Sequence, residues 1–241
     1  MNESLNPLHR EGVESSMKGT TGREPTIEAD YRIELARKAI HLFSLLIPIV
    51  YFFISRSEAL TILFPLTAAF LIVDVARFYH HPTADWFYKT FGWLLRSKEQ
   101  DTRKKRLNGA THVLLSATLC VLVFPKLITI TAFSILIISD SVAALVGRKF
   151  GKHVFFKKTL EGSIAFFLSA IVVVLVAPKA EYTYGEYAIG VVASAVGAVI
   201  EALSIDVDDN LSIPLSIGIT MWVLYALLNQ PFEPSGISLS L

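Results

Sequence analysis

The sequence has few of the features that stabilise soluble or disulfide-linked proteins. It contains one cysteine, Cys120, in 241 residues, which excludes an internal disulfide. Asp, Glu, Lys and Arg make up 18% of the residues, against about 25% in an ordinary soluble domain. The 22 Lys and Arg and 21 Asp and Glu give a net charge of +1. This balance gives no general reason to expect nucleic-acid binding. No internal repeat and no inverted symmetry of the kind found in transporters is visible.

Apolar residues are abundant instead, at 53% of the chain, and they are concentrated in long runs. The Asp, Glu, Lys and Arg residues within these runs are only Asp74, Asp140, Glu186 and Glu201. Runs close to the roughly 20 residues needed to cross a bilayer predict transmembrane helices. We therefore expect an all-α, polytopic membrane helical bundle with about seven transmembrane helices, at 39–55, 59–76, 109–124, 127–147, 162–178, 186–203 and 211–229.

The distribution of basic residues predicts how the bundle is oriented. When the seven spans alternate across the membrane, 19 of the 22 Lys and Arg residues fall on the side of the N-terminus. Basic loops stay cytoplasmic, so the N-terminus is predicted to be cytoplasmic. Residues 1–30 are polar and mixed in charge, and we expect a disordered cytoplasmic tail followed by one membrane domain over 31–241. The first apolar run begins only at Ala39, so no cleaved signal is expected.

The connection between the second and third spans mixes aromatic and basic residues. Between Ala84 and Arg96 it contains Trp86, Phe87, Phe91 and Trp93. This composition is typical of an amphipathic helix that lies in the headgroup layer with its aromatic face inward. Packing against other cytoplasmic loops is the alternative.

Asp140 is the strongest candidate for a functional residue. An ionisable group inside hydrocarbon is costly and marks either a site or a buried pair. Small residues follow at four-residue spacing, at Ala143, Gly147 and Gly151, which allows another backbone to approach closely. Helix packing around a hydrogen-bonded aspartate is the alternative interpretation.

A basic, glycine-containing loop follows, from Arg148 to Ser163. Main-chain amides at a helix N-terminus and nearby cations are what a polyphosphate requires. The loop is not a Walker A motif, because Gly147 and Gly151 have three residues between them where that motif needs four. Positive charge that only enforces topology would also explain it. The phosphate-binding candidates here are Gly147, Arg148, Gly151, Lys152, Lys158, Thr159 and Gly162.

An acidic segment links the last two spans. Glu201, Asp206, Asp208, Asp209 and Asn210 lie within ten residues. Oxygen ligands of this kind suit Mg²⁺, which binds one or two carboxylates together with water and substrate phosphate. A solvated turn is the alternative.

Two further polar groups open predicted spans. Arg37 and His41 are four residues apart on one helical face, with Lys38 beside them. These cations would also serve as anchors that extend toward the membrane surface. Asn108 and Thr111 form a capping-type entry to the third span, and their polar groups are candidates to face the site. Together with the preceding segments, these groups place opposite charges at one membrane face, as a metal–nucleotide complex above a lipid headgroup requires.

Several of these motifs together resemble the CTP-dependent polyprenol kinase family, which comprises dolichol kinases, phytol kinases and fungal-type diacylglycerol kinases and is related to phosphatidate cytidylyltransferases. The matching elements are Arg37-Lys-x-x-His41, the run Ser139 to Gly151, Lys157-Lys-Thr-Leu-Glu-Gly-Ser163, and Glu201 with Asp209-Asn-Leu-Ser-Ile-Pro214. The resemblance extends from Arg37 to about Tyr225. Ser139 stands where many members have glycine, and Asn108 stands where threonine is commoner; neither difference removes a charge.

The resemblance implies transfer of the γ-phosphoryl group of CTP to the hydroxyl of a membrane lipid alcohol, with Mg²⁺ as cofactor. It implies catalytic roles for Asp140, Lys158 and Glu161, and metal binding by Asp140, Glu161, Asp208 and Asp209. Phosphate binding would fall to Arg37, Lys38, Arg148, Lys152 and the glycines and threonine of the basic loop. The remaining site candidates are His41, Asn108, Thr111, Glu201 and Asn210.

Four matters stay open at this level: the reaction class, the nucleotide base, the lipid alcohol and the oligomeric state. A CTP-dependent cytidylyltransferase would use the same nucleotide but retain CMP on the lipid, and a non-catalytic lipid transporter or binding protein would use the polar groups as a gate. The sequence does not identify the base of the nucleotide, because no base-reading element is recognisable. It also leaves open the lipid alcohol, which is phytol, a polyprenol or diacylglycerol, and the oligomeric state.

Overall fold

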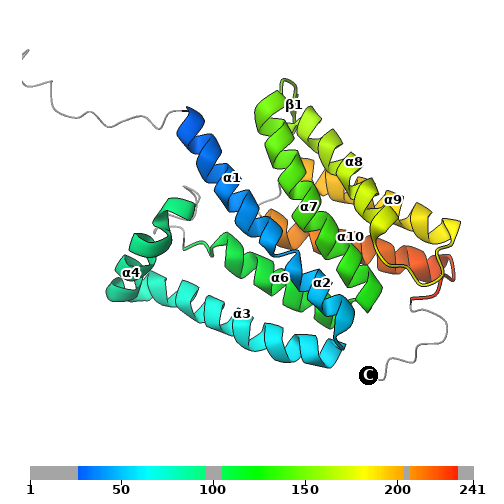
Figure 1. The fold of residues 1–241 in the computed structure, drawn as a ribbon, viewed down its shortest axis with the longest axis horizontal. Helices are drawn as coiled ribbons and strands as arrows, with labels where there is room; N and C mark the ends of the chain where they lie inside the picture. The colour runs from blue at the N-terminus through cyan, green and yellow to red at the C-terminus, as the bar shows by residue number, and fades with distance from the viewer. Residues whose placement is uncertain (1–26, 96–104, 204–206, 233–241) are drawn as a thin grey trace, which may run out of the picture.

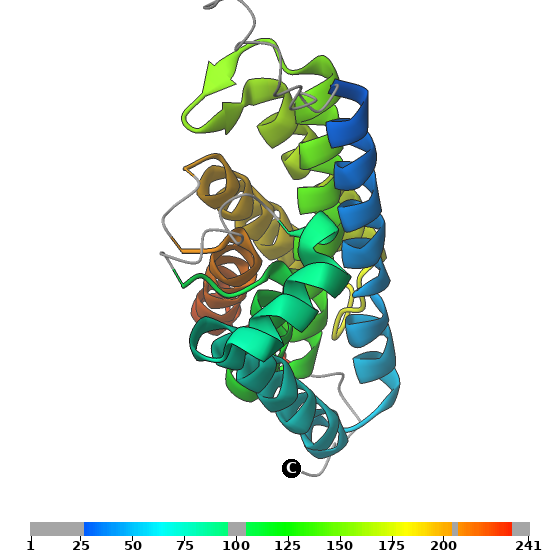
Figure 2. The same ribbon diagram turned by 90° about the vertical axis from the view of Figure 1, so that its left-hand side faces the viewer.

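The computed structural model describes residues 27–95, 105–203 and 207–232. Most of the predicted tail, residues 1–26, lies outside this range, as does Asp206. The described part is a helical bundle with one short hairpin (Figures 1 and 2). Its elements are α1 (Ile27–Phe43), α2 (Leu46–Phe53), α3 (Arg56–Tyr79), α4 (His81–Phe91), η3 (Gly92–Leu94), α6 (Gly109–Val123), α7 (Lys126–Phe150), β1 (Val154–Phe155), β2 (Lys158–Thr159), α8 (Leu160–Val176), α9 (Tyr184–Leu203) and α10 (Asp209–Leu227).

The predicted all-α membrane bundle is confirmed. Five stretches of helix are long and apolar enough to cross a membrane: Leu35–Phe53, Arg56–Tyr79, Lys126–Phe150, Tyr184–Leu203 and Asp209–Leu227. They indicate an integral membrane protein. The other two predicted spans correspond to the shorter apolar helices α6 and α8, so the count of seven stays a prediction, as does the cytoplasmic placement of the N-terminus.

The first predicted span is interrupted between α1 and α2. Proline at position 48 has no N–H and its ring clashes with the carbonyl four residues earlier, at Ser44. At this point the hydrogen bonds span three residues instead of four, from Ser44 N to His41 O (2.9 Å) and from Leu45 N to Leu42 O (2.9 Å). Helix geometry resumes at Leu46. Both α1 and α2 pack on α7, along one side of the bundle (Figure 2).

Helix α7 lies at the centre of the bundle and contacts α1, α2, α6, α8 and α10 (Figure 1). Its middle is buried on all sides, because Ile135, Leu136 and Ile137 have no exposed surface. A helix that is apolar all round needs partners all round. Phe124, Phe133 and Phe166 are the largest buried side chains of this core.

A buried ion pair holds the junction of α3, α4 and α6. Arg77 Nε lies 2.6 Å from Asp74 Oδ1, as the three-residue spacing predicts. The other carboxylate oxygen accepts from Asn108 N (2.7 Å), and Arg77 Nη2 donates to Arg106 O (2.7 Å). The Arg77 guanidinium also lies over the Phe87 ring, 4.6 Å from its centroid. These contacts fix α4 across the end of α3 (Figure 1).

The predicted amphipathic helix corresponds to α4 and η3, which begin three residues earlier than expected, at His81. Its aromatic side chains divide between two environments, because Phe87 is buried while Trp86 and Trp93 are exposed. Exposed tryptophans suit a headgroup layer. The location of this segment relative to a membrane remains a prediction.

Candidate functional site

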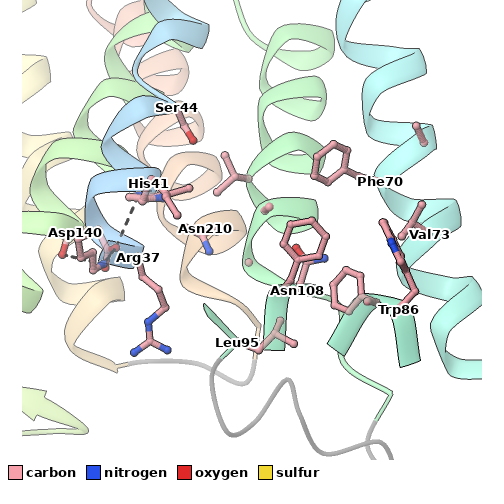
Figure 3. Close-up of a pocket in the computed structure, with 18 residues that line it drawn as sticks. Arg37, His41, Ser44, Phe70, Val73, Trp86, Leu95, Asn108, Asp140 and Asn210 are labelled. Carbon is pink, nitrogen blue, oxygen red and sulfur yellow. Dashed lines mark hydrogen bonds and ion pairs between the residues drawn. The ribbon is translucent and has the colours of Figure 1, made fainter. Parts of the chain in front are cut away.

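Asp140 is enclosed by two basic side chains from α1, Lys38 and His41. It is 7% exposed, and Lys38, which is 4% exposed, donates to its Oδ2 and to its main-chain oxygen (3.4 Å). His41 Nε2 lies 3.9 Å from the same carboxylate oxygen. Lys38 and His41 are neighbours on one face of α1, because positions three apart differ by nearly one helical turn. The contact of α1 with α7 therefore brings the first predicted motif onto the intramembrane aspartate (Figure 3).

Lys158, on β2, lies between two carboxylates from the last two helices. Its Nζ is 2.9 Å from Glu201 Oε1 on α9 and 2.9 Å from Asp209 Oδ2 on α10. Glu201 is buried, and its other oxygen accepts from Ser163 Oγ (3.2 Å). Burial alone would lower the pKa of Lys158, but the charges of Asp209, Glu201 and Asp140 raise that pKa above its usual range. Lys158 therefore keeps its positive charge at any physiological pH.

The two groups lie within electrostatic range of each other, because the charge of Asp140 contributes to the raised pKa of Lys158. Residues from α1, α7, β2, α9 and α10, distant in sequence, contribute to the two groups. We use the name charged cluster for Lys38, His41, Asp140, Lys158, Glu201 and Asp209. The carboxylates of this cluster offset the charges of its lysines. A phosphate would compete with these carboxylates for the lysine N–H donors.

The glycines and threonine of the predicted phosphate loop lie where α7 meets α8. Thr159 caps α8, because its Oγ1 accepts from Gly162 N (3.2 Å). A Cβ on Gly147 would lie 2.8 Å from that same oxygen, and one on Gly162 would lie 3.1 Å from Ala143 O. On Gly151, a Cβ would lie 2.2 Å from Gly147 O. The sequence predicted that these residues bind the nucleotide, and the structure shows that they also allow α7 and α8 to pack closely. The two roles do not exclude each other.

The outer part of the basic loop includes exposed cations and a short hairpin. Arg148 and Lys152 are exposed at the end of α7 and beyond it. Glu161 accepts from His153, through Nδ1 at 2.8 Å and the main-chain N at 3.3 Å. Glu161 was predicted to act with Asp140, whereas in the structure its carboxylate accepts hydrogen bonds from His153. The unexpected β1–β2 hairpin, Val154–Thr159, explains the pairing because it folds the loop back on itself.

The first residues of α10 carry the remaining predicted metal ligands. Asp208 caps the helix, where its Oδ1 accepts from Asn210 N (3.0 Å) and Nδ2 (2.7 Å). His112 Nδ1 lies 3.9 Å from Asp208 Oδ2. The four predicted ligands thus have different partners: Lys38 for Asp140, His153 for Glu161, Asn210 for Asp208 and Lys158 for Asp209. Within the described ranges, no group of three or more His, Cys, Asp or Glu side chains is arranged to hold a metal ion.

Asn108 and Thr111 open α6 as the sequence predicted. Asn108 is the N-cap, and its Oδ1 accepts from Thr111 N (2.9 Å). Thr111 is fully buried, and its hydroxyl has no hydrogen-bond partner among the described residues. Asn108 also lines a cavity, described next, whereas Thr111 does not.

A cavity of about 630 Å³ adjoins the charged cluster (Figure 3). Its walls are mainly apolar and come from α1, α3, α4 and α6, with Asp140 and Asn210 at one side. The sequence does not mark Ser44, Phe70 and Val73 as cavity residues, because such side chains occur throughout predicted spans. The aromatic content of α4 was the available signal, through Trp86, Phe87 and Phe91. The polar residues of the wall are Arg37, Lys38, His41, Ser44, Asn108, Asp140 and Asn210.

Two known proteins are similar to this chain in sequence. The uncharacterized protein RP860 of Rickettsia prowazekii is 33% identical over 193 residues, which cover 78% of this chain and 92% of that protein. The CTP-dependent diacylglycerol kinase 1 of Saccharomyces cerevisiae is 32% identical over 146 residues, which cover 58% of this chain and 48% of the kinase. The match thus spans about half the length of that kinase. No protein-family model and no solved structure matches the chain.

Proposed function

We propose that this chain, which belongs to the same family as the Rickettsia prowazekii protein RP860, is a membrane lipid kinase. It transfers the γ-phosphoryl group of CTP to a lipid alcohol. One observation carries the proposal: Asp140 lines an apolar cavity and is also part of the charged cluster. A hydrophobic alcohol and a polyphosphate therefore have adjacent places on either side of one carboxylate. The similarity to a CTP-dependent diacylglycerol kinase supports the choice of donor.

The proposed reaction needs a base and charge neutralisation. The alcohol oxygen attacks the γ-phosphorus, the bond from that phosphorus to the β–γ bridging oxygen breaks, and CDP leaves. The hydroxyl proton passes to the carboxylate of Asp140, which belongs both to the wall of the apolar cavity and to the charged cluster. Lys38 and Lys158 neutralise the charge of the phosphates, each after exchanging a carboxylate for a phosphate oxygen. A role for Glu161 requires that its carboxylate first leaves His153.

Mg²⁺ belongs to the proposal as a partner of the nucleotide. The described carboxylates do not form a preassembled metal site, but Mg²⁺ in kinases needs one or two carboxylates beside the substrate phosphates. Asp208 and Asp209, adjacent at the start of α10, are the side chains that would hold it. When bound, the ion would neutralise phosphate charge and orient the transferred group.

The decisive experiment follows the label of CTP with purified protein and a panel of phytol, a polyprenol and diacylglycerol. We expect γ-phosphate label in the lipid product, and no transfer in the presence of a chelator. Label transferred from the α-phosphate instead would identify a cytidylyltransferase. If neither label reaches any lipid and CTP does not raise the thermal midpoint of the protein in detergent, the proposal is wrong and a transporter or binding protein becomes the better interpretation.

A further inference from the structure

The cavity beside Asp140 separates two parts of the bundle. On one side, α1 packs on α7 and reaches η3; on the other, α3 packs on α6 and α4. The cavity occupies the space between α1 and α3, with α6 behind it (Figure 3). Its volume of about 630 Å³ falls in the range of roughly 300–1,000 Å³ that small-molecule sites have.

The mouth of the cavity is apolar and exposed. Ile40, Phe70 and Val73 line the cavity and are themselves 54%, 40% and 36% exposed. They belong to the two membrane-spanning stretches Leu35–Phe53 and Arg56–Tyr79. Exposed apolar side chains of membrane spans face acyl chains, so the opening between α1 and α3 leads into hydrocarbon rather than water. The exposed Trp86 of α4, which suits the interface, marks the headgroup end of this opening.

The inner end of the cavity is polar. His41 Nε2 and Asp140 Oδ2 lie 3.9 Å apart, too far for a hydrogen bond between them, so a hydroxyl could bridge the two groups as donor and acceptor. Asn108, which lies apart from His41 and Asp140 near Leu95 and Trp86 (Figure 3), adds an amide to the α6 wall, and its oxygen caps α6. An apolar body with a few polar groups at one end matches an amphiphile that carries its polar group at the end of a hydrocarbon chain.

We infer that this cavity is the acceptor site: it binds the hydroxyl-bearing end of a lipid alcohol, which enters sideways from the bilayer between α1 and α3. The inference rests on the proposed function. The hydroxyl lies between His41 and Asp140, and the adjoining hydrocarbon lies against Phe70 and Val73. The rest of the chain stays in the bilayer, since the cavity has room for one end of a membrane lipid. The protein therefore selects its substrate by the shape next to the hydroxyl and not by total chain length.

Two adjacent alanines of α3 provide a matched test. Both side chains are exposed, but Ala69 lines the cavity and Ala68 does not. In Ala69→Trp, the new ring occupies space that hydrocarbon would otherwise fill. Excluding two buried methylenes corresponds to roughly fifteenfold weaker binding of the alcohol. We expect Ala69→Trp to raise the KM for the alcohol by about that factor or more, with the KM for CTP unchanged, and Ala68→Trp to leave both values unchanged.

Photolabelling separates this inference from the proposed reaction. Diacylglycerol and phytol, each carrying a diazirine close to the hydroxyl, are irradiated with the wild-type protein and both variants in lipid vesicles without CTP. We expect labelled peptides from the cavity walls, which are α1, α3, α4, α6 and the parts of α7 and α10 around Asp140 and Asn210, with label lost in Ala69→Trp and kept in Ala68→Trp. Label on other helices, or label unaffected by Ala69→Trp, overturns the acceptor site. Correct labelling with no phosphoryl transfer by the wild-type protein would instead refute the kinase reaction and leave the lipid-alcohol site standing.

Discussion

Neutralising the buried pair Lys38–Asp140 one member at a time separates its structural role from its chemical role. Lys38→Met keeps the length of the side chain and removes its charge, and Asp140→Asn keeps the shape and removes the carboxylate. Each leaves the other charge buried without its closest partner, since both side chains are at most 10% exposed. Removing one member of a buried pair costs about 3–5 kcal/mol of folding free energy. Removing both leaves neither member of this pair as an unpaired buried charge, and the cost falls to about 1 kcal/mol.

The assay is thermal unfolding in detergent for the wild type, both single variants and the double variant. One kcal/mol corresponds to roughly 2–4 °C for a chain of this size. We therefore expect each single variant to unfold about 6–20 °C below the wild type and the double variant within about 4 °C of it. Additive losses in the double variant would refute the reasoning, because they would mean that the two groups do not interact in the folded protein.

Lipid phosphorylation by the same four proteins then isolates the chemical role. Loss of a general base lowers the rate by about 10²–10⁴-fold. The stable double variant should therefore be as inactive as Asp140→Asn, although its fold is restored. Near-normal phosphorylation by either variant that lacks the carboxylate would remove Asp140 from the reaction while leaving its structural role intact.

Three further predictions concern neighbouring parts of the molecule. Lys158→Met should lower phosphorylation by roughly a hundredfold. The neighbouring carboxylates raise the pKa of Lys158, so its charge and the stabilisation by its ion pairs should persist up to the ordinary lysine pKa of about 10.4 and be lost only above it. A loss of wild-type activity below pH 9 would therefore not come from this lysine. Asp74→Asn should cost about 3–5 kcal/mol in unfolding experiments, because Arg77 is then buried without a carboxylate; a midpoint like that of the wild type would contradict the buried pair. Gly147→Val should destabilise by about 1–3 kcal/mol, since its Cβ meets Thr159 Oγ1 at 2.8 Å, whereas Gly147→Val that unfolds normally but no longer binds CTP would assign the glycine to the nucleotide.

The helices that cross the membrane were predictable because each one satisfies its own backbone. A span in hydrocarbon must be apolar along its whole length, and that requirement is visible in any window of the sequence. The contact between Asp74 and Arg77 was equally local, as residues three apart share a helical face. The break at Ser44 was missed, although Pro48 was a local signal for it.

The candidate site was predictable in composition and not in pairing. Lys38, Asp140, Lys158 and Asp209 were all identified as site candidates from their unusual positions. Their partners depend on which helices touch, and apolar spans of similar composition give no information on that. The sequence therefore grouped Glu161 with Asp140, whereas the hairpin after α7 directs Glu161 to His153.

By itself, the sequence determined that this is a helical membrane protein whose charges gather at the helix ends, because burying an isolated charge in hydrocarbon costs too much free energy for any other placement. Only the tertiary structure decided that α1 lies on α7, so that Lys38 meets Asp140, and that α1 and α3 stay apart, so that a cavity opens beside this pair. Helix contacts in a membrane depend on the fit of side chains across interfaces, and that fit arises only when the whole bundle is assembled.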